Sequence, residues 1–362
     1  MNTSEFFPAD YQDGRRKFLE AATTAGAEIA SYQNPLRGPE GERLFTDLAW
    51  LGPRDVRRVL LSMSGTHGVE GFAGSGIQTG SIQQGIYRSL PDATAVALVH
   101  AVTPYGFAWL RRTNEDGVDV CRNFVDFAKP LPRNAVYDEL ARVLVPEDWT
   151  GAGREQADER YLGYIREHGG LDRLKAQVAR GQYDYWFAPF FGGRAPTWSN
   201  RTFREILGTH LGRAREVAAI DYHTGLGDYA TGQLLGFHRP GEAPHERAAA
   251  CWGETFVSVH ADATVAYQLT GEILRALEEE LPHATITAAA YEFGTVEPMA
   301  VLQALRGDHW LHAYGDFSSP LAKEIKTSIR DALYCDADDW RERVFDLAVL
   351  AEQQALAMLG VS

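Results

Sequence analysis

Short apolar runs that alternate with helical segments constrain the fold of this chain more than any other feature. Apolar runs that end in polar residues are typical of buried strands in a parallel sheet. The segments expected to be strands are 44–52 and 56–63, read as a strand pair, and 94–102, 216–223 and 284–295. The segments expected to be helices are 15–31, 72–86, 134–144, 154–180, 202–214, 264–280 and 339–359. This alternation predicts an α/β fold, with a mixed, largely parallel central sheet and helices on both faces.

The pattern favours one domain over residues 1–362. The chain is long enough to bury a large core, and no internal repeat or low-complexity linker divides it. Residues 125–200 are the least regular part, and within them 189–201 is expected to be a long ordered loop. We therefore expect 125–200 to be an insertion or lid within a single domain.

Charge and composition exclude several classes of partner. The formal net charge is −14, with 35 Lys and Arg residues against 49 Asp and Glu residues. Such a surface repels phosphate backbones and anionic lipids, so we expect the protein to bind neither nucleic acid nor membranes. The expected partner is a small substrate. The amino terminus lacks the layout of a secretory signal, and three scattered cysteines do not form a disulfide framework. The sequence therefore favours a cytoplasmic protein, and it predicts no particular oligomeric state.

Histidine or glutamate follows three of the apolar runs directly. The three segments are SGTHGVEG (64–71), DYHTGLG (221–227) and YEFGT (291–295). Sites in open α/β sheets form beyond the carboxyl ends of the strands. The polar side chains of the three segments are therefore expected to meet at one place.

These side chains suit a zinc site. A catalytic zinc ion takes three protein ligands, and His67, Glu70 and His223 would supply two imidazoles and a carboxylate. Each alone has a simpler explanation, because H-x-x-E is a weak motif and His223 could be a satisfied core histidine. Asp221 lies on the same strand face as His223 and could support the site. Glu292 would be costly to bury without a partner, which indicates either a role beside a metal-bound water or an ion pair with arginine.

The segment RRTNEDGVDVCRNF (111–124) concentrates positive charge in an otherwise acidic chain. Arg111, Arg112 and Arg122 lie within twelve residues. Guanidinium groups hold carboxylates bidentately and polarise carbonyl oxygens. A solvated charged loop is the alternative, but beside a zinc site the three arginines become candidate substrate-binding residues.

In this order, the motifs resemble those of the zinc carboxypeptidase superfamily, which also includes aspartoacylase and succinylglutamate desuccinylase. The resemblance runs from about residue 56 to residue 300. GTHGVE is similar to the family's G-x-H-x-x-E, and DYHTG is similar to the segment with the third ligand. The resemblance implies a zinc carboxypeptidase-like fold and one Zn²⁺ ion held by His67, Glu70 and His223.

Further roles follow from the same resemblance. RTNEDGVDVCRNF is similar to R-x-N-x-x-G-V-D-L-N-R-N-F, and YEFGT is similar to the segment that carries the general base. Arg112 would then polarise the scissile carbonyl, Arg122 would bind the substrate carboxylate, and Asp119 would orient His67 through its second ring nitrogen. Glu292 would be the general base.

Two positions leave alternatives open. AYQLTG (266–271) resembles the family's Y-Q-x-S-G segment, which nominates Tyr267 for substrate binding, but Tyr267 could equally pack within the expected helix 264–280. Cys121 stands where the family has asparagine, and a thiol cannot replace the two donors of an amide. A structural substitution is the preferred interpretation of Cys121, ahead of a nucleophile or a fourth metal ligand.

The sequence thus predicts a zinc-dependent hydrolase of an amide bond next to a carboxylate. A carboxypeptidase-like metallopeptidase acting on short peptides is the first interpretation. A deacylase of N-acyl amino acids is the alternative, because GTHG and D-x-H-T look closer to the desuccinylase branch. A catalytically silent zinc-binding protein with this fold is the third.

Overall fold

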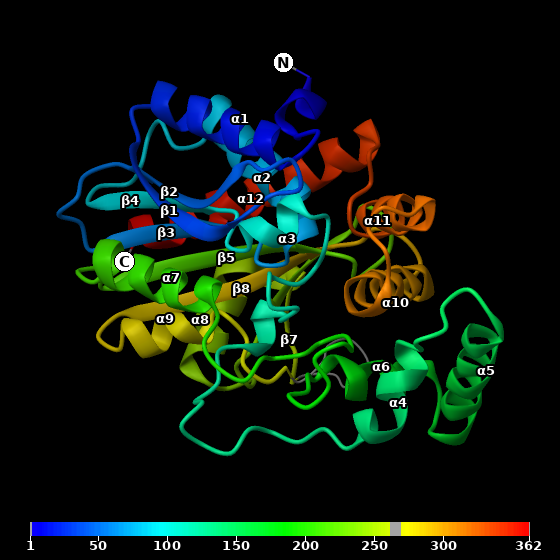
Figure 1. Ribbon diagram of the computed structural model, residues 1–362. Helices are drawn as coiled ribbons and strands as arrows, with labels where there is room; N and C mark the ends of the chain where they lie inside the picture. The colour runs from blue at the N-terminus through cyan, green and yellow to red at the C-terminus, as the bar shows by residue number, and fades with distance from the viewer. Residues whose placement is uncertain (1, 261–268, 362) are drawn as a thin grey trace.

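The central sheet has eight strands in the order β1-β2-β4-β3-β5-β8-β6-β7 (Figure 1). The computed structural model describes residues 2–260 and 269–361. The β3–β4, β3–β5, β5–β8 and β6–β7 pairs are parallel, and the other three pairs are antiparallel. The strands are β1 (Glu28–Arg37), β2 (Arg43–Leu51), β3 (Arg58–Met63), β4 (Thr94–His100), β5 (Glu216–Thr224), β6 (Gly232–Gly236), β7 (Phe256–Ser258) and β8 (Thr285–Phe293). This mixed, mostly parallel sheet confirms the predicted fold class.

Helices cover both faces of the sheet, because the central strands are apolar on both sides. In β3, for example, Leu60 belongs to one apolar cluster, whereas Val59 and Leu61 belong to the other. Figure 1 shows α1, α2 and α12 on one side of the strands, with α7 and α9 on the other. The helices are α1 (Tyr11–Thr24), α2 (Gly71–Gln83), α3 (Pro104–Ala108), α4 (Val136–Leu144), α5 (Ala152–Glu167), α6 (Leu171–Ala179), α7 (Trp198–Ile206), α8 (Ala243–Trp252), α9 (Arg275–Glu280), α10 (Pro298–Tyr314), α11 (Pro320–Leu333) and α12 (Asp338–Val361).

The amino-terminal helix is shorter than predicted. Helix α1 ends at Thr24, and Gly26 then adopts φ +78°, a conformation that favours glycine and stops the helix. Residues 28–31, expected to be helical, instead begin β1, which pairs with β2 alone and is an edge strand. Pro35 lies where the β1–β2 register shifts, so its missing N–H does not weaken the pairing.

The expected pair of strands 44–52 and 56–63 does not form. Both segments are strands, but β4 lies between β2 and β3 and pairs with each of them. The prediction relied on the short connection between the two segments, which favours a hairpin. Both faces of β3 are buried, however, which is typical of a strand inside a sheet. Strand β3 therefore lies between two parallel neighbours, β4 and β5.

The region 125–200 carries α4, α5 and α6, which lie to one side of the sheet in Figure 1. Its helices have an apolar cluster of their own, which includes Tyr137, Leu140 and Leu174 and packs against Leu302 and Trp310 of α10. Arg306 of α10 donates to the carbonyl oxygens of residues 143 and 144 of α4. This region is thus anchored on α10, and its movement as a lid stays a prediction.

Three expected boundaries after residue 150 are wrong. The expected helix 154–180 is two helices, α5 and α6, separated by Gly169 and Gly170 at φ +90° and +96°. The expected loop 189–201 ends earlier, since α7 begins at Trp198 with the Thr197 side chain as its cap. Of the expected helix 264–280, the described part 269–274 is not helical and only 275–280 forms α9.

Helix α12 is long and apolar enough, by length and composition alone, to cross a membrane. In the fold it contacts α2, α8, β3 and β5. Its buried residues, such as Trp340, Val344 and Phe345, belong to the apolar cluster on that face of the sheet. The apolar composition of α12 therefore matches its position in the core.

Candidate metal centre

The segment after β3 brings His67 and Glu70 together in a tight turn. Gly65 adopts φ +65°, and Gly68 begins a short 3₁₀ turn, Gly68–Glu70, that leads into α2. A Cβ atom at Gly68 would lie 2.1 Å from the carbonyl carbon of Gly106 in α3, so only glycine allows this close packing. The result is a distance of 3.1 Å between His67 Nδ1 and Glu70 Oε1.

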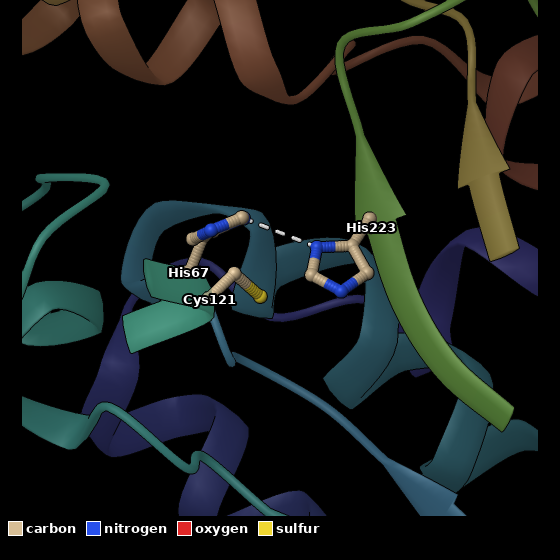
Figure 2. A group of neighbouring side chains, drawn as sticks. All are labelled: His67, Cys121 and His223. Atoms are coloured by element: carbon tan, nitrogen blue, oxygen red, sulfur yellow. Dashed lines mark hydrogen bonds between the residues drawn. The ribbon is translucent and has the colours of Figure 1, made fainter. Parts of the chain in front are cut away.

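The end of β5 adds His223 to this pair. Strand β5 lies parallel to β3, so the carboxyl ends of both strands are at the same edge of the sheet. His223 Nδ1 lies 3.1 Å from His67 Nδ1 and 3.3 Å from Glu70 Oε2, and Figure 2 shows the two imidazoles facing each other. All three side chains are at least 97% buried. The structure therefore brings the three predicted ligands together.

Carboxylates fix the orientation of both imidazoles. His67 Nε2 lies 3.0 Å from Asp119 Oδ1, and His223 Nε2 lies 2.7 Å from Asp221 Oδ2. A carboxylate accepts, so each neutral imidazole carries its proton on Nε2 and leaves Nδ1 bare. Two bare nitrogens and the Glu70 carboxylate then converge on one another, which is favourable only with a cation or protons among them.

The spacing of these atoms suits zinc. With bonds of about 2.0 Å, neighbouring ligand atoms of a tetrahedral zinc ion are about 3.3 Å apart. The two Nδ1 atoms are 3.1 Å apart, and each lies 3.1–3.3 Å from one of the two Glu70 oxygens, His67 from Oε1 and His223 from Oε2. The three side chains therefore fit a zinc ion, with two histidines oriented by carboxylates as metal-ligating histidines usually are.

Neighbouring carboxylates raise the pKa values of both imidazoles. Burial and the Arg112 charge lower the pKa of His67, but the carboxylates of Glu70 and Asp119 outweigh them and raise it to about 10. Burial lowers the pKa of His223 too, but the adjacent Asp221 raises it well above the ordinary value. Burial favours the neutral form of Glu70, but the charges of His67 and Arg112 lower the pKa of this carboxyl group.

We expect zinc binding at pH 7 to release at least one proton, because Nδ1 must be bare to bind the metal. The zinc affinity should then rise by about tenfold per pH unit for each proton released, until the pH passes the His67 pKa of about 10. Calorimetric titration of zinc in two buffers of different ionisation enthalpy measures the number of protons. Equal heats in both buffers would contradict the proposed ligand set.

Two further groups satisfy the Glu70 carboxylate. Arg112 Nη1 lies 2.5 Å from Oε1, and the backbone N–H of Thr224 donates to Oε2 at 3.0 Å. Arg112 Nε also lies 3.3 Å from Asp119 Oδ2, so this arginine contacts two carboxylates of the site while it lines the adjacent cavity. Its position allows contact with both the site and a bound substrate.

Glu292 lies one strand away from the metal ligands. On the parallel strands β5 and β8, Glu292 is the register partner of His223. Its Oε2 atom is buried and has no hydrogen-bond partner among the described residues. Burial raises the pKa of Glu292, and the negative charge of Glu70 raises it further. The positive charge of His223 lowers it, and the pKa is about 7. A carboxylate with this pKa and an unpaired oxygen can accept a proton near neutral pH.

A cavity of about 150 Å³ lies beside these residues. Its wall combines the site with the insertion and α10, and its lining is mainly aliphatic. A second cavity of about 480 Å³ shares Phe237, Val259 and Leu269 with the first. Apolar or aromatic residues of the first cavity include Val178, Phe190, Leu226, Leu235, Phe237, Val259, Ala290, Val301, Leu302 and Leu305.

Arg122 and Arg111 have different surroundings. Arg122 lines the cavity, and its guanidinium donates three N–H groups to the carbonyl oxygens of Ala179 and Cys121. Arg111 is instead buried beside Asp308 of α10, with 3.6 Å between Nε and Oδ2, in a cluster that includes Lys326 of α11. The cavity lining does not include Arg111 among the described residues, so the structure does not place it for substrate binding as predicted.

The remaining predicted residue, Tyr267, lies outside the described residues. The sequence analysis missed two contributors. The Thr66 hydroxyl donates to Asp221 Oδ1 at 2.7 Å, and Lys175 of α6 lines the cavity. Thr66 lies inside the GTHG motif and could have been found there, whereas no local pattern connects Lys175 to the site.

Comparison with known proteins assigns a family. A family model described as "Protein of unknown function (DUF2817)" matches residues 7–346. The chain belongs to this family. No curated protein matches this chain.

Solved structures define the fold of this DUF2817 member. Thrombin-activatable fibrinolysis inhibitor has a TM-score of 0.53 at 9% identity, covering 98% of this chain and 74% of that chain. The bovine protein, in complex with tick carboxypeptidase inhibitor, has a TM-score of 0.51 at 8% identity, covering 98% of both chains. Carboxypeptidase A from Helicoverpa armigera has a TM-score of 0.47 at 12% identity, covering 90% and 74%.

Proteins of the aspartoacylase and succinylglutamate desuccinylase type also match, at TM-scores of 0.40. At these low identities, the two matches above 0.5 show the fold alone. The fold is carboxypeptidase-like α/β, as the order of the motifs predicts.

Proposed function

We propose that this protein is a zinc-dependent hydrolase that cleaves an amide bond next to a carboxylate in a small substrate. The observation that carries the proposal is the convergence of His67 Nδ1, His223 Nδ1 and the Glu70 carboxylate within 3.3 Å, beside the unpaired oxygen of Glu292. A cluster of acceptors at this spacing needs a cation or protons among its atoms, and Glu292, with a pKa of about 7, can accept a proton near neutral pH. Both properties suit metal-assisted hydrolysis.

His67, Glu70 and His223 would hold the zinc ion. When bound, it would supply Lewis acidity and lower the pKa of a water molecule toward ~7. Glu292 then takes the proton of the attacking water and later delivers it to the leaving nitrogen. Arg112 offers positive charge to the oxygen of the carbonyl under attack, as positioned donors do in acyl transfer.

Arg122 supports a substrate that carries a carboxylate. Three of the five N–H groups of its guanidinium donate to backbone carbonyls, which fixes the side chain in the cavity wall. Nη1 also lies 3.5 Å from Asp119 Oδ1, so part of the Arg122 charge is paired with a buried carboxylate of the site. The guanidinium still lines the cavity, where it offers positive charge to a substrate carboxylate, and the aliphatic cavity beside it suits an apolar group on the same substrate.

The first candidate activity is a carboxypeptidase-like metallopeptidase acting on short peptides. The second is a deacylase of N-acyl amino acids. The replacement of the family's asparagine by Cys121 removes two amide donors that could bind a substrate α-carboxylate, and it does not separate the two activities, because both substrates carry an α-carboxylate. In both cases the small cavity, bounded by Val178 of the insertion and Leu302 of α10, suits a short substrate.

The zinc-loaded protein should hydrolyse an N-acylated dipeptide that ends in leucine with a free carboxyl group. Mass spectrometry of the products separates the two activities. Release of leucine identifies a carboxypeptidase, and loss of the acyl group alone from the corresponding N-acyl amino acid identifies a deacylase. Bound zinc with no hydrolysis of a panel of amides and esters would contradict the proposal and favour a catalytically silent zinc protein.

A further inference from the structure

Cys121 lies beside the candidate ligands, at the position where the family motif has asparagine. It belongs to the short turn Val120–Arg122, and its side chain is 5% exposed. One ligand atom each from Cys121, His67 and His223 forms a group in which all separations are within 4.8 Å. Figure 2 shows the Cys121 sulfur directed toward the imidazoles. The preferred interpretation from the sequence, a purely structural substitution, does not explain this position.

The same carboxylate oxygen positions Cys121 and His67. Asp119 Oδ1 accepts a hydrogen bond from the Cys121 backbone N–H at 3.0 Å and lies 3.0 Å from His67 Nε2. The turn is closed by the backbone N–H of Arg122, which donates to the carbonyl oxygen of Asp119 at 2.9 Å. Asp119 therefore fixes both the backbone at Cys121 and the tautomer of His67.

The position of the sulfur fits a ligand better than a nucleophile. A catalytic thiol needs an imidazole as its base, oriented by a third group. Here both imidazoles direct Nδ1 toward each other and toward Glu70, within 3.3 Å, so neither Nδ1 is directed as a base for the thiol alone. A thiolate beside the cation of the proposed centre adds a fourth donor, and its negative charge partly neutralises the charge of the cation.

We propose that the Cys121 thiolate is a fourth protein ligand of the metal ion held by His67, Glu70 and His223. The inference rests on the metal centre of the proposed function. With four protein ligands, the water molecule of the proposed hydrolysis would have to bind as a fifth ligand, because three protein ligands and a water already complete a four-coordinate zinc site. It makes the donor set two nitrogens, one oxygen and one sulfur, where the family pattern has no sulfur. Thiolate ligands select softer metals, so this centre should favour cadmium over zinc more strongly than a centre of two histidines and one glutamate.

Cobalt substitution tests the proposal, because a cobalt–thiolate bond produces a charge-transfer band in the near ultraviolet. We compare the full-length wild-type protein with Cys121→Ser and with the control Cys251→Ser, in α8. The band is expected in the wild type and in Cys251→Ser, and it should be lost in Cys121→Ser while cobalt stays bound. Retention of the band in Cys121→Ser would overturn the proposal.

Two other outcomes are distinguishable. Cobalt bound to the wild type without the band would overturn the Cys121 ligand and leave the three-ligand centre intact. No cobalt binding would overturn the centre itself and, with it, the proposed function. If Cys121→Ser does not fold, cadmium NMR of the cadmium-loaded wild-type protein tests the proposal instead. A resonance in the downfield range of thiolate-bound cadmium supports the ligand, and one typical of nitrogen and oxygen ligands alone contradicts it.

Discussion

Glu292→Gln should abolish turnover while zinc stays bound. The substitution keeps the shape of the side chain but removes its ability to accept a proton from water. Glu292 is not one of the atoms that converge on the metal position, so the zinc content should not change. General-base catalysis typically contributes 10²–10⁴-fold, and we expect kcat to fall by about that factor. Product release and zinc content of the same sample measure both effects.

Glu297→Gln is the matched control. Glu297 directly precedes α10, and its exposed side chain makes no capping hydrogen bond to this helix and is not part of the cavity lining. The control should keep wild-type turnover and zinc content. If Glu292→Gln were fully active, Glu292 would not be the general base. If Glu292→Gln lost zinc, its role would be ligation or support of the site instead.

Asp221→Asn should lower the zinc affinity by about 10–100-fold, the usual effect of removing the carboxylate partner of a metal-ligating histidine. Asp221 accepts from His223 Nε2 at 2.7 Å and from the Thr66 hydroxyl at 2.7 Å. An asparagine can direct its amide N–H toward the imidazole. His223 then carries its proton on Nδ1, where it blocks the metal. Competition with a chromophoric chelator measures the affinity.

Asp228→Asn, in the exposed loop after β5, is the control and should leave the zinc affinity unchanged. The thermal unfolding midpoint of each metal-free variant separates a loss of affinity from a loss of folding. An unchanged zinc affinity in folded Asp221→Asn would contradict the role of Asp221 in orienting His223. Activity at saturating zinc should recover in part, because the ligand itself is still present.

The candidate site could be predicted from the sequence because its residues lie in or just after the carboxyl ends of strands. Once 56–63, 216–223 and 284–295 are read as parallel strands, the positions of His67, His223 and Glu292 at one edge follow from the geometry of a parallel sheet. The orientation of the imidazoles was also predictable in part. Asp221 belongs to the same short segment as His223, and Asp119 belongs to the arginine-rich segment 111–124.

What could not be predicted depends on contacts between distant segments. Nothing near Arg111 in the sequence indicates its burial against Asp308, 197 positions later, so its positive charge looked available to a substrate. The order of strands was misread for a similar reason, because the insertion of β4 between β2 and β3 is decided by burial of both faces of β3. The position of Cys121 beside two histidines also needed the three-dimensional structure.

The backbone pairing of β5 and β8 has a consequence for how this family can vary. His223 and Glu292 are opposite each other on adjacent parallel strands, so the spacing between ligand and base is set by strand separation, about 4.8 Å. Side chains alternate between faces along a strand. One residue inserted or deleted within β8 would turn Glu292 to the other face of the sheet. Length changes among related sequences should therefore be absent from these two strands and concentrate in the connections between them.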